Sequence, residues 1–75
     1  MREYVGVVSK ISGETFVLTY IGENGEKHLT ARLLPPASTK SIVVGNKVRI
    51  VGDWAGTLGA GALTTFAARE IEVLG

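Results

Sequence analysis

The chain has no cysteine among its 75 residues, and this absence removes several kinds of site at once. No disulfide can hold the fold together, and no zinc site can be built on thiolates. A cysteine-free composition fits a reducing compartment without requiring one, and a cytoplasmic location is our expectation. A single histidine, His28, and no paired-carboxylate motif leave little for catalysis, so we expect no enzyme, no metal and no cofactor.

An excess of charge of one sign is also absent. Eight basic and seven acidic residues give a net charge of +1, whereas dedicated nucleic-acid-binding proteins are usually much more basic. Binding to phosphates would therefore depend on local charge patterning. No apolar run approaches the roughly 20 residues of a membrane-spanning helix, and the first residues are not followed by the apolar core of a signal peptide. We expect no membrane insertion by this segment.

The chain contains instead a series of short β-strand patterns separated by glycines. No segment shows helical periodicity over a helical length, and the connection after Pro35-Pro36 has room for one helical turn at most. Five strands in so short a chain cannot build two packed sheets, but they can close into a barrel that removes exposed edges. We predict an all-β, five-stranded barrel, closed or partly open, in a single domain over residues 1–75. Its strands are expected at residues 4–11, 14–21, 27–33, 47–51 and 66–74.

Asn24-Gly25, between the second and third strand patterns, is the strongest short hairpin signal in the sequence. With these two as the turn residues of a type I′ turn, Tyr20 would face Leu29 across the hairpin. Since side chains alternate along a strand, this register divides them between two faces. The inward face would hold Phe16, Leu18, Tyr20, Leu29, Ala31 and Leu33, and the outward face would hold Val17, Thr19, Ile21, His28, Thr30 and Arg32.

Two further glycines are expected at bends of the barrel. Gly6 lies inside the first strand, and Gly52, followed by Asp53, is expected to end the fourth. The segment 51–68 would then be the connection between the last two strands, one that could continue both past the barrel rim. Trp54 would lie at the start of this loop, where it either stacks on a ligand or turns inward to close the barrel.

The order of these patterns resembles the OB-fold. "GVVSKISGETFVL" resembles the opening of many OB domains, "IVVGNKVRIVG" is similar to their fourth strand, with Asn46 where aspartate is usual, and "FAAREIEVL" is similar to their closing strand. The run "ENGEKHLTARLLPPASTKSIVVGNKVRI" is similar to the middle of the bacterial translation initiation factor that is a lone OB barrel, but it lacks that factor's basic connection and tail. The chain also resembles the soluble OB domain of NfeD-type membrane proteins.

The OB resemblance implies a ligand face on the outer side of the second and third strands, edged by the loops after the first and fourth. Our first hypothesis is a non-catalytic module that binds single-stranded nucleic acid weakly, through Lys10, His28, Arg32, Lys47, Arg49 and Trp54. The NfeD-type resemblance implies protein contacts instead. The alternative hypothesis is therefore a protein-interaction or self-association module, with Val17, Thr19, Ile21 and Thr30 at its contact surface.

Overall fold

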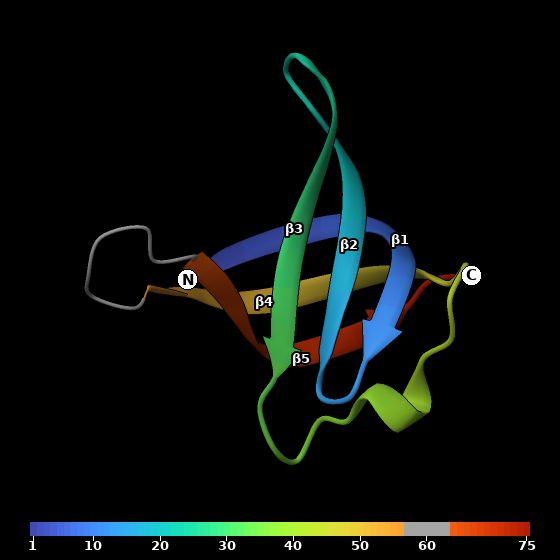
Figure 1. The fold of residues 1–75 in the computed structure, drawn as a ribbon, viewed down its shortest axis with the longest axis vertical. Coiled ribbons are helices and arrows are strands. Elements are labelled where there is room, and N and C mark those ends of the chain that lie inside the picture. Colours follow the sequence, from blue (N-terminus) through green and yellow to red (C-terminus); the bar gives the residue numbers. More distant parts are fainter. Residues whose placement is uncertain (57–63) are drawn as a thin grey trace.

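The computed structural model describes residues 1–56 and 64–75, which form a closed barrel in the order β1-β2-β3-β5-β4 (Figure 1). The strands are β1 (Arg2–Ser12), β2 (Thr15–Gly22), β3 (Gly25–Leu33), β4 (Lys47–Gly56) and β5 (Thr64–Val73). A single 3-10 turn, η1 (Thr39–Ser41), lies in the connection between β3 and β4. The predicted all-β, five-stranded, OB-like barrel with a largely non-helical connection is therefore confirmed. Within the described ranges, no helix has the length and apolar character needed to cross a membrane.

The core is the inward face that the alternation of the sequence predicts. Phe16 and Leu18 on β2 and Ala31 on β3 are almost completely buried, and Tyr20 packs against them at one end of the barrel. Val48 and Ile50 supply the matching face of β4. The described residues bury no polar or charged side chain, so apolar packing alone fills the barrel.

The register of the β2–β3 hairpin differs from the prediction by two residues. Gly22 pairs with Gly25, so Glu23 and Asn24 form the turn, and Tyr20 lies opposite Lys27 instead of Leu29. Gly25 has a φ of 109° but Asn24 has no positive φ, so the predicted type I′ turn at Asn24-Gly25 is wrong. A shift of two residues keeps every side chain on the same face. The hydrophobic pattern therefore could not distinguish the two registers.

The prediction that Gly52-Asp53 ends the fourth strand is also wrong, because β4 continues through Trp54 to Gly56. Gly52 lies at a β-bulge, where a Cβ atom would collide with the backbone of Ala67 on β5. Gly6 has the same role in β1, where a Cβ atom would collide with the carbonyl group of Thr19. Both glycines allow two backbones to approach closely. Gly52 thus marks a bend inside a strand instead of its end.

The β2–β3 hairpin extends beyond the barrel. Pairing between β1 and β2 begins at Val7 and Thr19, and pairing between β3 and β5 begins only at Ala31. The turn end of the hairpin, residues 21–27, therefore projects from the rest of the described chain, as Figure 1 shows at the top of the view.

Candidate functional site

The structure places the predicted outward residues of β2 and β3 on one continuous surface. Val17 lies opposite Thr30 and Thr19 lies opposite His28, and Lys10 on β1 lies opposite Val17. Val17 and Thr19 are half-buried, while Ile21, His28, Thr30 and Arg32 are exposed. The assignment of these residues to the outer face is therefore confirmed.

A chain of polar side chains crosses this surface from β1 to β3. Ser9 Oγ donates to the Val17 carbonyl oxygen at 3.2 Å and lies 3.0 Å from Thr19 Oγ1. Thr19 Oγ1 is in turn 2.8 Å from His28 Nδ1, and the Glu26 carboxylate lies 3.6 Å from His28 Nε2. These contacts fix the orientation of the imidazole ring. Sequence reasoning did not include Ser9 among the candidate residues. The β-bulge between Val8 and Lys10 leaves both Ser9 and Lys10 on the outer face, and it has no sequence signal here.

Both arginines expected to contact phosphates are held by carboxylates. Arg49 pairs with Glu3 on β1 and with Glu72 on β5, where its Nε lies 3.1 Å from the Glu72 Oε1 atom. The hydrogen bond to Glu3, followed by the one to Glu72, raises the pKa of Arg49 above its ordinary value. Arg32 Nη2 donates to Glu14 Oε2 at 3.1 Å. Neither guanidinium is therefore an isolated positive charge.

Lys10 and Lys47 differ from the arginines, since neither forms an ion pair in residues 1–56 and 64–75. Both are exposed, and Lys47 on β4 lies opposite Val7 on β1. Lys10, opposite Val17, and Lys47, opposite Val7, therefore lie beside the outward side chains of β1 and β2.

The sequence predicted that Trp54 would lie at the start of the loop after the fourth strand. This prediction is wrong, because Trp54 lies within β4. It lies opposite Phe66, with the two ring centroids 5.3 Å apart in a T-shaped arrangement. Its indole Nε1–H donates to Tyr4 Oη at 3.1 Å, yet 39% of Trp54 is exposed. The ring thus packs against the end of the barrel and still presents part of its surface to solvent. Tyr20 completes this aromatic cluster, with its ring centroid 5.1 Å from that of Tyr4.

Exposed apolar side chains occur on the outer sides of both β1 and β2. Val5 and Val7 are each 42% exposed, and Ile21 is 78% exposed. We call Val5, Val7, Val17, Thr19 and Ile21 the outer β1–β2 face. Sequence reasoning found the β2 members but missed Val5 and Val7, because two adjacent valines, Val7 and Val8, leave the direction of alternation in β1 ambiguous.

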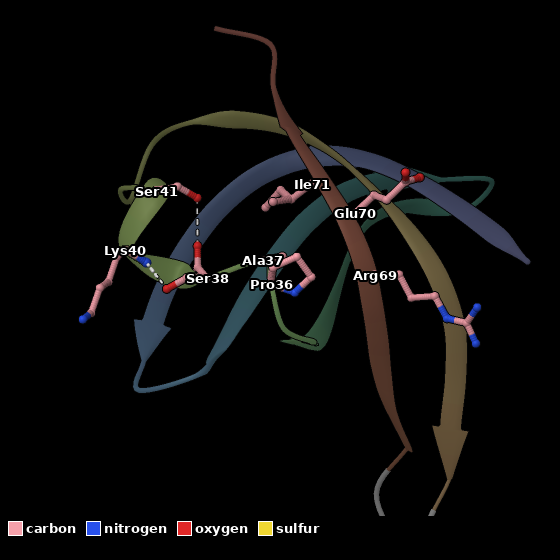
Figure 2. Close-up of a pocket in the computed structure, with 8 residues that line it drawn as sticks. All are labelled: Pro36, Ala37, Ser38, Lys40, Ser41, Arg69, Glu70 and Ile71. Atoms are coloured by element: carbon pink, nitrogen blue, oxygen red, sulfur yellow. Dashed lines mark hydrogen bonds between the residues drawn. The ribbon is translucent and has the colours of Figure 1, made fainter.

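A hollow of about 670 Å³ lies between the β3–β4 connection and β5 (Figure 2). Its polar groups serve local structure, since Ser38 Oγ accepts from the Lys40 amide and Ser41 Oγ donates to the Ser38 carbonyl oxygen. Lys40 and Arg69 point away from each other in Figure 2. The hollow therefore lacks the converging polar groups of a small-molecule site. No metal-binding cluster of His, Cys, Asp or Glu is found in the described ranges.

No protein-family model, no curated protein and no solved structure matches the chain.

Proposed function

We propose that this chain is a non-catalytic binding barrel of the OB type that contacts a partner protein through the outer β1–β2 face. The observation that carries the proposal is the exposure of Val5 and Val7 on the outer side of β1, where Val7 pairs with Thr19 on β2. Scattered single apolar residues need no explanation on a protein surface, but adjacent ones bordered by polar groups are typical of contact sites.

The border of this face has the character of an interface rim. Thr19 and Ser9 are already hydrogen-bonded within the chain, so a partner could cover them without leaving these hydroxyl groups unpaired. Lys10 and Lys47 stand at the edge, where charged side chains can remain in contact with water. A partner of complementary charge would meet these two ammonium groups around an apolar centre.

The experiment that tests this proposal is photo-cross-linking in cells that produce the protein. A photoreactive amino acid replaces Val7 in one variant and Val44 in the control. Val44 is the matched position, because it is also an exposed valine, at 59%, but lies outside the outer β1–β2 face. We expect discrete protein adducts from position 7 that position 44 does not give, whether the captured partner is another protein or a second copy of the chain.

Two results would contradict the proposal. The first is the absence of any discrete adduct from position 7, and the second is an identical set of adducts from positions 7 and 44. A Val5→Lys substitution supplies a further check, because a charge placed in an apolar contact should abolish the adducts of position 7. Val5 is 42% exposed, so this change should leave the fold intact.

A second candidate function is weak binding of single-stranded nucleic acid. It is favoured by Trp54, whose partly exposed ring could stack on a base, and by Lys10 and Lys47, which form no ion pair with the described residues. It ranks second because Arg32 and Arg49 are engaged with carboxylates and would have to exchange those partners for phosphates.

Titration of labelled oligonucleotides at about 50 mM salt, where phosphate contacts are strongest, tests this second function. If it is correct, Trp54→Ala weakens binding without changing the salt dependence, while Lys47→Ala reduces the salt dependence. Lys40→Ala is the control, because Lys40 lies on η1 in the β3–β4 connection and outside the strands that carry Lys10, Lys47 and Trp54. Saturable binding that survives all three substitutions, or no binding at all, would eliminate it.

A further inference from the structure

The strand β3 has a free edge over its first half. Its pairing with β5 covers only Ala31–Leu33, and no other described strand pairs with β3 on that side. Glu26, Lys27 and His28 are exposed in this first half of β3. The edge of a β-sheet presents unpaired N–H and C=O groups, which a further extended chain can bind.

The register identifies which backbone groups point to this edge. Gly22 and Gly25 close a two-residue turn and form a hydrogen-bonded pair, so Lys27 and Leu29 also bond toward β2. The ends of the strand agree with this alternation. The Leu33 amide donates to Glu14, on the β2 side, at 3.3 Å, while the Leu34 amide donates to Ala68 on β5 at 2.9 Å. The N–H and C=O groups of Glu26 and His28 therefore point away from β2.

The side chains beside this edge carry charges of opposite sign on opposite faces. Glu26 lies on the outer face with a side chain that is 63% exposed. Lys27 lies on the inner face, where its methylene groups cover Gly22. In an added antiparallel strand, neighbouring residues also alternate between the two faces. A strand with a basic residue opposite Glu26 and an acidic residue opposite Lys27 would match both charges.

We propose that the edge of β3 at Glu26 and His28 binds an extended peptide segment by antiparallel strand addition. The favoured peptide carries a basic side chain opposite Glu26 and, one residue earlier, an acidic side chain opposite Lys27. This site goes beyond the proposed contact on the outer β1–β2 face, because it uses main-chain groups of a different strand. If the β3 edges of two copies of the chain paired antiparallel with Lys27 at the centre, the two Lys27 side chains would lie opposite each other and repel. This repulsion favours a foreign peptide over a second copy.

The test uses a synthetic peptide, acetyl-Thr-Val-Val-Glu-Lys-Thr-amide, titrated into the ¹⁵N-labelled protein. Its lysine is placed opposite Glu26 and its glutamate opposite Lys27. We expect saturable shifts of the amide signals of Glu26 and His28, because these two N–H groups gain hydrogen bonds. Exchanging the glutamate and lysine of the peptide keeps its composition but places like charges together, and should weaken binding severalfold.

N-methylation of the peptide supplies the decisive control. A methyl group on the second valine, opposite His28, removes an N–H that bonds to the edge and should weaken binding about tenfold. A methyl group on the glutamate nitrogen faces solvent and should have little effect. The proposal is overturned if no saturable shift appears at millimolar peptide, or if the two methylated peptides bind equally. Shifts confined to Val5, Val7 and Ile21 would also overturn it, while leaving the contact on the outer β1–β2 face standing.

Discussion

Replacing Gly52 by alanine distinguishes a bend inside β4 from the strand end that the sequence suggests. A Cβ atom at Gly52 would meet the carbonyl group of Ala67 and the Cα atom of Ala68, and backbone atoms cannot move aside as a flexible side chain can. Overpacking of this kind costs about 1–3 kcal/mol of unfolding free energy, and contact with backbone places Gly52→Ala near the upper value. A loop glycine at a strand end would instead tolerate alanine.

The expected effect is large for so small a protein. A domain of 75 residues has an unfolding free energy of roughly 4–11 kcal/mol. A loss of about 3 kcal/mol lowers the Tm of a domain of this size by roughly 12–24 °C. Thermal and urea unfolding followed by the fluorescence of Trp54 measure this loss, since Trp54 is the only tryptophan and packs on Phe66.

Gly13→Ala is the matched control for this substitution. Gly13 has a φ of 60° but nothing within 4 Å of a Cβ atom, so alanine there costs about 1–2 kcal/mol through backbone strain alone. The expected order of stability is therefore wild type, Gly13→Ala and then Gly52→Ala. A Gly52→Ala protein as stable as wild type would show that β5 does not approach Gly52 as described.

Three further perturbations test the core, the ion pairs and the aromatic cluster. Leu18→Ala should lower the unfolding free energy by about 2–5 kcal/mol because Leu18 is fully buried. Ile21→Ala, at an exposed position on the same strand, should change the unfolding free energy by less than about 0.5 kcal/mol. Equal effects of the two substitutions in urea unfolding would contradict the assigned faces. Arg49→Ala should lower the Tm more at low salt than at high salt, because it removes the cation that pairs with both Glu3 and Glu72. An unchanged salt dependence of the Tm would refute this. Tyr4→Phe should shift the emission maximum of Trp54, since the indole N–H loses its acceptor, and an unshifted spectrum would show that this hydrogen bond does not form in solution.

The local pattern of the sequence determined which side chains are buried, because the alternation along a strand is a property of the chain itself. Leu18 and Ala31 are inside and Thr19 and Thr30 are outside in either hairpin register. Pro35-Pro36 likewise required β3 to end before it, since proline has no N–H to donate to a ladder.

The tertiary structure alone decided the register and the charge partners. A period of two residues is unchanged by a shift of two, so only the closed barrel shows that Tyr20 lies opposite Lys27. Arg49 reads as a free cation in the sequence because Glu3 and Glu72 lie 46 and 23 residues from it along the chain. Closure of the barrel sets β4 between β1 and β5 and brings these charges together. Local propensities do not encode such distant pairing, so only the folded barrel shows how its outer surface is charged.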